Sequence, residues 1–571
     1  MTVKIKFRRL NGVGVNSIFV ALFATGVVGS PLSSNAQTPP DPGRIEQQLP
    51  TPTPPSPAPE ISVPQREDLT APPGSDREKF QLKSLAIEGA TVYPKSRFES
   101  FYTQLLGKEI SLSDLYGVAN DITRLYRQDG YVLSLAVVPE QTIRDGVARL
   151  QVIEGYIEKA TFEGAPPQQL ARLKGFGEKI QASRPLKVKD LERYLLLAND
   201  LAGFKVRAIL RRGSRLGTSV LVGKVNYDPV NAFGELTNRG TEAVGPFRLQ
   251  AGLLLNSLMG QGEQITLRGA TSLDDPHELA LGSANFSIPV GHDGLRVNLG
   301  GSYTEFNPGA DLKAFGINGR TFAVEAGLVY PVVRSRNTTI SVSGGFDYAD
   351  SRNTLSFSNL NAVLSEDRLA VLRVGVQLQN IDAQGSFLAS AQLSQGVGGS
   401  TSENQTEPLS REAGSSTFTK VNLNLSRTQK LPGQFALLLA GKAQLTGDTL
   451  LSRELFGLGG ETFGSAFDPD QVVGDFGYGL RAELQRPLLY QAFGMTMKTQ
   501  PYLFADHGWV FRNSPTAAEN SSDALSSAGL GIRHNFGSQI FVGLELAFPI
   551  QRTDRVFSSD PRLFFVVNGF F

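Results

Sequence analysis

The chain has 571 residues, with 55 Lys and Arg against 54 Asp and Glu, and it contains no cysteine. The balanced charge argues against a nucleic-acid partner that is held by an excess of positive charge. The lack of cysteine excludes disulfides and thiolate metal sites, so stability must come from packing and backbone pairing. A chain of this length needs more than one core, and several domains are expected.

The N-terminal residues have the pattern of an export signal. Four basic residues occur within the first nine positions, and Val13 to Val28 carry no charge. Ser34-Asn35-Ala36 supplies small residues of the kind that a signal peptidase recognises, so we predict a signal peptide over 1–36. A retained membrane anchor is the alternative. No apolar run of 18 or more residues follows, so the sequence offers no spanning helix, and the exported chain is expected to be soluble or a membrane β-barrel.

A proline-rich segment follows the predicted signal peptide. Positions 38–73 contain 12 of the 32 prolines, which favours an extended spacer rather than a packed unit. The stretch "GRIEQQL" interrupts the prolines, and a helical turn of that length is marginal in water unless it docks on another part of the chain. We predict a linker over 37–79 that contains a possible short plug segment or, alternatively, an unstructured tail.

From Phe80 the pattern changes to alternating strands and helices. Apolar residues at spacings of three and four predict helices near 96–106 and from Ser111 to Gly130, and apolar stretches predict strands over 80–87, 131–138 and 147–154. The resulting βααββ order then repeats. The second copy has strands at "YIEKATFEG", 204–211 and 219–225, and helices over 168–181 and 188–201. We predict two α+β modules, 80–155 and 156–228.

Beyond Asp228 the helical periodicity gives way to an alternation of apolar and polar residues. Examples are "QITLRG", "LRVNLG", "VLRVGVQLQ" and "KVNLNLS". A soluble β-sandwich also alternates, but many segments here reach about ten residues, the length that a tilted strand needs to cross a bilayer. About sixteen such segments occur, so we predict an antiparallel transmembrane β-barrel over 229–571.

The sequence gives little support to an enzyme. Its four histidines include no pair with metal-ligand spacing. Asp506-His507 resembles an acid/base pair, but neighbouring strand residues point to opposite faces of a sheet. The glycine-rich stretch "LFGLGGETFGSAFDPD", 455–470, lacks the Lys-Ser/Thr pair of a phosphate-binding loop. We therefore expect no catalytic site, no cofactor and no bound metal.

One stretch carries a specific family resemblance. "GYVLSLAVVPEQTIRDGVARLQVIEG", 130–155, resembles the outer-membrane transporters of two-partner secretion, the haemolysin secretion/activation proteins. In that family the α+β modules are periplasmic POTRA domains. The motif residues are Gly130, Pro139, Gln141, Asp145, Gly146, Glu154 and Gly155.

The resemblance also gives the glycine-rich stretch a location. In this family a long extracellular loop folds back into the barrel, and a Val-Arg-Gly-Tyr/Phe motif on it pairs with an acidic residue of the inner wall. By position the loop motif matches Gly464, Ser465, Ala466 and Phe467. The acidic wall motif matches Phe504, Asp506 and Gly508. Because Ser465 replaces the arginine, at most one neutral hydrogen bond to Asp506 is expected, and either the loop is held loosely or another cation such as Arg481 serves Asp506.

The resemblance implies a secretion pore that recognises an unfolded exoprotein with its POTRA domains and exports it without ATP. The implied partners are a large, β-helical exoprotein, the outer-membrane lipid and the barrel-assembly machinery, which reads the last strand ending at Phe571. From the strand alternation we expect these residues to line the lumen: Gln264, Arg268, Arg296, Arg373 and Gln377. An insertase that assembles membrane proteins, and a passive porin, are the alternatives.

Overall fold

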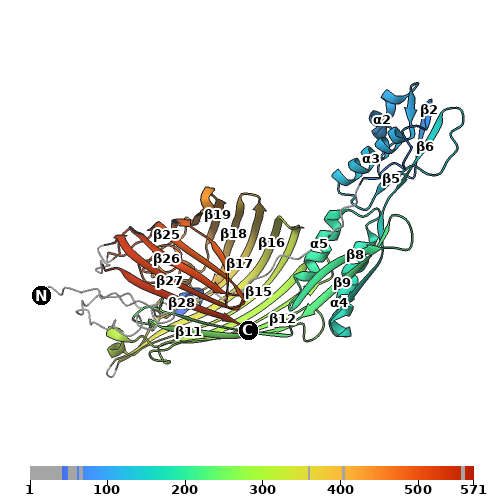
Figure 1. Ribbon diagram of the computed structural model, residues 1–571. Helices are drawn as coiled ribbons and strands as arrows, with labels where there is room; N and C mark the ends of the chain where they lie inside the picture. Colours follow the sequence, from blue (N-terminus) through green and yellow to red (C-terminus); the bar gives the residue numbers. More distant parts are fainter. Residues whose placement is uncertain are drawn as a thin grey trace. The chain divides into compact units, whose positions relative to one another are not determined.

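The computed structural model describes residues 42–48, 61–62, 68–357, 360–401, 406–517, 519–553 and 560–571. The predicted signal peptide lies outside these ranges. Within them the chain forms two small α+β modules and one closed antiparallel barrel (Figure 1). No helix in the described part of the chain is long and apolar enough to cross a membrane.

The first module packs helix α3 on a small sheet. Its elements are β2 (Lys79–Gln81), β3 (Ser84–Glu88), α2 (Ser96–Tyr102), the 3₁₀ turn η3 (Thr103–Leu105), β4 (Glu109–Ser111), α3 (Leu112–Gln128), β5 (Leu135–Val137) and β6 (Val147–Ile153). The sheet has the order β3-β6-β5, and β2 pairs separately with β4. Ser111 and Asp114 cap the start of α3 reciprocally. The predicted apolar stripe of α3, from Leu115 to Tyr126, is buried against the sheet.

Two strand predictions in this module are wrong. The predicted strand 80–87 is two strands in different sheets, because Lys83 leaves the β2 line and donates its N–H to the carbonyl of Gly146. Only 135–137 of the predicted strand 131–138 is extended, since Ser134 N–H bonds back to the Tyr131 carbonyl in a turn. A short apolar run cannot distinguish a strand from a buried turn.

The second module follows the predicted order of elements. They are β7 (Tyr156–Glu163), α4 (Pro167–Ala182), α5 (Val188–Asn199), β8 (Phe204–Arg212) and β9 (Thr218–Tyr227). A two-residue strand from the linker, β1 (Ile61–Ser62), pairs in parallel with β8, which gives the sheet order β1-β8-β9-β7. Two backbone hydrogen bonds of 2.8 Å join the modules, from Val188 N–H to the Gly130 carbonyl and from Leu186 N–H to the Gly155 carbonyl.

The barrel strands lie in sequence order around a closed wall. They are β10 (Val230–Thr237), β11 (Arg248–Asn256), β12 (Gln264–Ser272), β13 (Ala280–Val290), β14 (Leu295–Phe306), β15 (Ile317–Arg334), β16 (Thr338–Phe357), β17 (Leu360–Asp382), β18 (Gly385–Gly399), β19 (Thr419–Lys430), β20 (Ala436–Thr446), β23 (Phe476–Gln485), β24 (Leu488–Ala492), β25 (Met495–Phe511), β26 (Ser522–Phe536), β27 (Ile540–Gln551) and β28 (Arg562–Phe570). β23 and β24 pair with β25 in one continuous register, interrupted only at Arg486-Pro487, so these 17 segments form 16 strands (17 − 1). The predicted strand number is confirmed.

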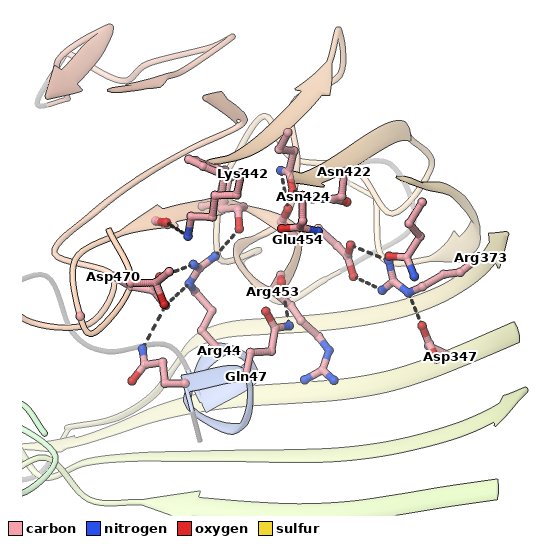
Figure 2. Close-up of a pocket in the computed structure, with 18 of the residues that line it drawn as sticks. Arg44, Gln47, Asp347, Arg373, Asn422, Asn424, Lys442, Arg453, Glu454 and Asp470 are labelled. Carbon is pink, nitrogen blue, oxygen red and sulfur yellow. Dashed lines mark hydrogen bonds and ion pairs between the residues drawn. The ribbon is translucent and has the colours of Figure 1, made fainter. Parts of the chain in front are cut away.

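The alternation of residues gives the wall two chemically different faces. Leu299, Leu328 and Leu372 are about half exposed on the outer face of the wall. In a membrane this apolar face contacts lipid. Arg373, one position after Leu372, points into the lumen (Figure 2). The barrel closes where β10 pairs with β28, and Ala232 and Phe571 exchange two backbone hydrogen bonds of 2.9 Å.

Candidate functional site

The loop between β20 and β23 is buried inside the barrel. It contains a short hairpin of β21 (Phe456–Leu458) and β22 (Val472–Gly474), and the residues between these strands turn back against the inner wall. Phe463 and Phe467 are buried in a cluster with wall residues of β25, β26 and β27. The stretch 455–470 is therefore a packed element of the lumen.

Glycines of the wall make room for the aromatic residues of the loop. A Cβ on Gly479 would lie 2.8 Å from the Phe463 ring, and one on Gly508 would lie 2.6 Å from the Leu458 side chain. Both glycines are on the inner face of their strands, opposite the lipid. Their missing side chains let the loop approach the wall closely, which is a physical reason for Gly508 in the Phe504-Asp506-Gly508 motif.

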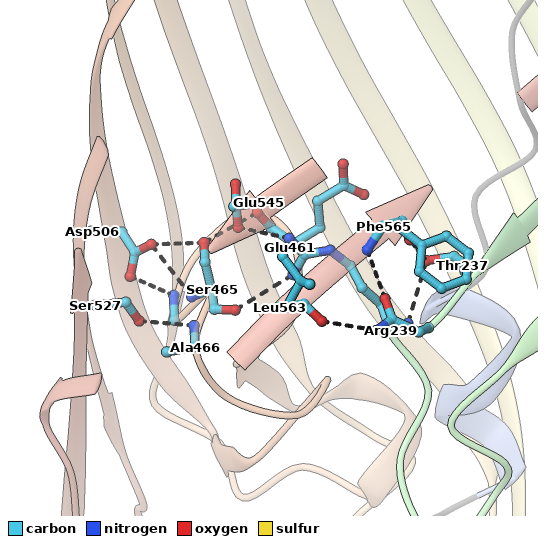
Figure 3. A network of polar contacts seen from close by, with 12 residues as sticks. Thr237, Arg239, Glu461, Ser465, Ala466, Asp506, Ser527, Glu545, Leu563 and Phe565 are labelled. Carbon is cyan, nitrogen blue, oxygen red and sulfur yellow. Dashed lines mark hydrogen bonds and ion pairs between the residues drawn. The ribbon is translucent and has the colours of Figure 1, made fainter. Parts of the chain in front are cut away.

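Asp506 is the acceptor that anchors the loop tip (Figure 3). Its carboxylate accepts the N–H groups of Gly464 at 2.8 Å and of Ser465 at 3.3 Å, and the Ser465 hydroxyl at 2.8 Å. Ala466 N–H donates to the Ser527 hydroxyl at 3.1 Å. The expectation of at most one neutral hydrogen bond is wrong, because backbone N–H groups that sequence reasoning did not consider add two more.

Arg481 of β23 also lies against Asp506. The two are direct cross-strand partners, 3.3 Å apart between Nη1 and the carboxylate. The guanidinium also donates to Glu483 at 2.8 Å, to Glu545 at 3.1 Å and to the Ser465 hydroxyl. It stacks over the Phe504 ring at 4.0 Å. With Ser465 in place of the family arginine, either the loop is held loosely or another cation serves Asp506. The geometry favours the second alternative, with Arg481 as the cation.

A wider network of opposite charges surrounds this anchor. Arg239 donates to Glu545 at 2.6 Å, and Tyr502 donates to the same carboxylate at 2.8 Å. Arg533 forms a fork on Glu483 with distances of 2.8 and 2.9 Å. Buried ion pairs are tolerated only when such additional hydrogen bonds satisfy them. Sequence reasoning missed these two glutamates, although Glu545 is the only charged residue of its strand β27.

The base of the loop is held by a second charged cluster. Glu454, just before β21, accepts from Arg373 at 2.8 Å and pairs with Lys420 at 2.8 Å. Arg373 also pairs with Asp347 on the neighbouring strand (Figure 2). Arg373 was expected only as lumen lining, and here it contacts the loop.

The other residues expected to line the lumen lie on the inner face without touching the loop anchor. Gln264 donates to Asn256 at 2.9 Å, and Arg268 donates to Ser283 at 3.2 Å, both within the wall. Arg296 donates at 2.8 Å to the carbonyl of Asp200 in the second module. Gln377 is exposed and shares its strand face with Arg373.

The segment "GRIEQQL" contacts the loop from inside the barrel (Figure 2). Its described part forms α1 (Pro42–Ile45) and the 3₁₀ turn η2 (Glu46–Gln48). Arg44 pairs with Asp470 at 2.8 Å and donates to the carbonyls of Leu455 at 2.8 Å and Ser452 at 3.0 Å. Ile45 is 1% exposed and packs against residues of β12 to β14. No sequence signal singled out Arg44.

A cavity of about 980 Å³ lies between this segment, the loop and the wall. Polar and charged side chains dominate its lining, among them Arg44, Arg239, Lys442, Glu325 and Asp470. Lys442 donates to the Gly457 carbonyl at 2.8 Å and lies over the Phe456 ring at 4.7 Å. The cavity is thus lined mainly by polar groups, although Phe456 and Phe463 of the loop also border it.

The motif residues of the first module hold its turns together. Asp145 and Gly146 both have positive φ, and the Gly146 carbonyl bonds to Lys83. Gln141 exchanges two hydrogen bonds with the backbone of Arg149, at 2.8 and 2.9 Å. Gly130 ends α3 with φ of 88°, and Gly155 is packed between Leu133 and Gly217. For Pro139 the structure gives no specific contact.

Glu154 ties the strand end to the loop before α2. It accepts the N–H groups of Thr91 at 2.7 Å and Val92 at 2.9 Å and the Tyr126 hydroxyl at 2.8 Å. Burial opposes its ionisation, but these hydrogen bonds outweigh burial and lower the pKa of Glu154 below its ordinary value. Burial and the bond to Glu154 raise the pKa of Tyr126.

Replacing Glu154 by Gln is expected to destabilise the first module by on the order of 2 kcal/mol, since hydrogen bonds to a charged acceptor are lost. Because the folded pKa is lowered, the stabilisation is present above about pH 4.3 and is lost as the pH falls through the folded pKa. Proteolysis of the full chain in increasing urea measures the loss. Glu140→Gln, at an exposed position of the same module, is the control and should behave as the parent.

His507 and Phe571 both lie away from the lumen. His507 bonds to Ser526 at 2.8 Å on the strand face opposite to Asp506, so the adjacent pair forms no acid/base dyad. Phe571 is 69% exposed at the end of the closing strand. In the described part of the chain no group of three His, Asp or Glu side chains could hold a metal ion.

Comparisons with known proteins assign the two parts of the chain. Residues 217–534, more than half of the chain, match the model of the haemolysin secretion/activation protein ShlB/FhaC/HecB, and residues 80–155 match the ShlB-type POTRA domain. The heme/hemopexin transporter protein HuxB of Haemophilus influenzae (strain 86-028NP) is 24% identical, over 78% of this chain and 79% of HuxB. The outer membrane transporter CdiB of Escherichia coli is 23% identical, over 83% of this chain and 80% of CdiB.

The solved structure of CdiB from Escherichia coli has the same fold. It superposes with a TM-score of 0.72 at 21% identity and covers 89% of this chain and 94% of that chain. The barrel of the present chain lies in the outer membrane, and its POTRA modules lie in the periplasm. The chain belongs to the ShlB/FhaC/HecB family of haemolysin secretion/activation proteins, which are two-partner secretion transporters of the outer membrane.

Proposed function

We propose that this chain recognises an unfolded exoprotein with its POTRA sheets and passes it in extended form through the barrel without ATP. One observation supports the recognition step above all. The edge strand β8 accepts an extended segment, because β1 of the linker pairs with it in parallel, Ile61 beside Ala208 and Ser62 beside Ile209. An edge that binds one extended segment through main-chain hydrogen bonds is suited to bind another.

The side chains of β8 supply the selectivity that main-chain pairing lacks. Val206 and Ala208 point into the module core, whereas Lys205 and Arg207 are exposed on the opposite face. A client strand on this edge would place alternate side chains beside the exposed positions. The described residues of the linker cover two residues of β8, and a longer client strand would pair more extensively and displace them.

A disulfide between Ile61→Cys and Ala208→Cys is expected to block secretion. The two residues are register partners, and the chain has no other cysteine, so oxidation fastens the linker to the edge that the client needs. Export of a co-expressed exoprotein should fall to less than about a tenth when client strand addition is required. A reductant should restore it, and neither single-cysteine variant should respond. Unchanged export by the oxidised protein would contradict recognition at β8.

The client path runs through the lumen, where the inward loop and the N-terminal segment lie. Both would have to move for an extended chain to pass. The polar inner face, with residues such as Gln264, Arg268, Arg296 and Gln377, offers weak and replaceable contacts to a moving chain. The sequence contains no nucleotide-binding motif, and folding of the client outside the cell would supply the driving free energy.

We further propose the following division of the chain. A signal peptide covers 1–36, a linker with a lumenal plug segment 37–79, the two POTRA domains 80–155 and 156–228, and the barrel 229–571. The hydrogen bonds of Gln141, Gly146 and Glu154 support a scaffolding role for the POTRA motif. The exposed Phe571 at the end of β28 suits recognition by the barrel-assembly machinery during insertion.

A further inference from the structure

The charged groups at the loop anchor lie on the wall and not on the loop tip. Asp506 belongs to β25, Arg481 to β23 and Glu545 to β27. In the described part of the chain the loop tip, residues 464–466, meets the charged wall groups only with neutral groups. These are the N–H groups of Gly464 and Ser465 and the Ser465 hydroxyl, which donate to Asp506, and the Ser465 carbonyl, which accepts from Arg239.

The wall charges remain paired without the loop. Asp506 keeps Arg481 at 3.3 Å, and Glu545 keeps Arg239 at 2.6 Å and Tyr502 at 2.8 Å. Departure of residues 464–466 therefore breaks hydrogen bonds but separates no ion pair of Asp506 or Glu545. The Asp468 carboxylate, further along the loop, pairs with Arg562 of β28 at 2.6 Å and lies outside this anchor. Separating a buried ion pair would leave an uncompensated charge in the wall, which is the more costly event.

We propose that Arg481 is the positioning residue of the anchor: it holds Asp506 with both carboxylate oxygens toward the loop, so that residues 464–466 bind to the wall and leave it as an uncharged segment. This proposal rests on the proposed movement of the loop during transport. Arg481 is suited to the task because its guanidinium is fixed on all sides by Glu483, Glu545 and the Phe504 ring.

The same geometry explains why a small neutral residue stands at position 465. Ser465 is fully buried, and its hydroxyl contacts the Arg481 guanidinium directly. A second guanidinium at this position would meet Arg481 at close range with only Asp506 between them. Ser465→Arg should therefore loosen the loop, the opposite of what an unserved Asp506 would predict.

The test follows the loop tip with one cysteine in the cysteine-free chain. Ala466→Cys places a thiol that is 3% exposed at the anchor, so a membrane-impermeant maleimide labels it only after the tip leaves the wall. The full chain, reconstituted in liposomes, carries Ser465→Arg, Arg481→Ser or both. Each single variant should accelerate labelling about tenfold or more, because it leaves a cation or an anion uncompensated.

The double variant is the decisive arm. An arginine at position 465 without one at position 481 restores one cation to Asp506, so labelling should return to within about threefold of the parent. Arg427→Ser is the matched control, since Arg427 pairs with Asp382 at 2.7 Å at the far end of β19, and it should change labelling by less than about twofold.

Two results would overturn the proposal: slower labelling in Ser465→Arg alone, or a double variant no slower than the faster single variant. Folding is monitored by the heat-sensitive gel mobility of the barrel. If Arg481→Ser does not fold, Arg481→Lys replaces it in the assay, because lysine keeps the positive charge but lacks the planar guanidinium with its several donors. Labelling of Arg481→Lys at the rate of the parent would also contradict a positioning role. The assay uses no client, so its failure leaves the secretion proposal standing, and failure of secretion leaves the anchor proposal standing.

Discussion

Deleting residues 42–48 is expected to raise the conductance of the barrel in planar bilayers several-fold. This segment lies inside the barrel beside the cavity of about 980 Å³, where Ile45 packs on the wall and Arg44 is clamped to the loop. Its removal joins the cavity to the freed volume. The inward loop stays in place on its own anchors, so the conductance should remain below that of an empty barrel.

Arg44 should account for most of this effect. Its side chain is 8% exposed, and Arg44→Ala leaves Asp470 without its cation, at a cost on the order of 3 kcal/mol. Such a loss raises the fraction of molecules with a released segment roughly hundredfold. Gln47→Ala is the matched control on the same segment, since Gln47 is exposed and makes one bond, of 3.2 Å, to the Arg453 carbonyl. A deletion variant with the conductance of the parent would show that the segment does not obstruct the lumen.

The barrel could be predicted from sequence because its information is local. Alternation with period two assigns every side chain of a strand to one of its two faces. Segments of about ten residues indicate membrane-spanning strands, and both signals can be recognised without knowing which strands pair. The helix of the first module was equally accessible, since Leu115, Ala119, Ile122 and Tyr126 form one stripe and Ser111 caps it. In both cases one segment carries its own signal.

The failed predictions concern segments whose conformation is decided by distant residues. The run at 131–138 is apolar because Tyr131 and Leu133 are buried in different clusters, and it turns between them. Residues 80–87 divide because Gly146, far along the chain, binds Lys83. No local pattern distinguishes these cases from a continuous strand.

Within the lumen, the family motif pointed to Asp506 as the wall partner and left Arg481 as one possible cation, but the other partners were beyond sequence reasoning. That Arg481 meets Asp506 depends on the register of β23 against β25. A shift of that register by one residue would place the two side chains on opposite faces of the wall. That Arg44 meets Asp470 depends on where the N-terminal segment 42–48 and the inward loop lie inside the barrel. The family motif located the loop and its partner Asp506, whereas only the geometry decided between the alternatives for Arg481 and supplied Arg239, Glu483 and Glu545.

Deleting residues 80–225 is expected to abolish export while the barrel still forms a pore. The barrel is closed by its own ladder between β10 and β28 and does not depend on the modules for closure. The second module contacts the barrel rim through polar pairs, such as the Arg334 to Asp200 pair at 2.7 Å and the hydrogen bond from Gln169 to the Ser257 carbonyl at 3.3 Å. Loss of the modules should therefore leave the wall intact and remove the sheet edge on which a client would bind.

The effect of this deletion also distinguishes a transporter from a passive porin. A porin needs no periplasmic module, so its function would survive the deletion. A transporter that selects its client with these modules, as proposed, would lose that selection. Assembly of the variant in the outer membrane, judged by its heat-sensitive gel mobility, is the required control.

The central claim is tested most directly by the amount of exoprotein that cells secrete when they carry either the full chain or the chain without 80–225. The conductance of both proteins is recorded in parallel. The account predicts secretion from the full chain, none above background from the deletion variant, and a pore in both. Secretion that persists without the modules would contradict the claim that these modules make the barrel a transporter.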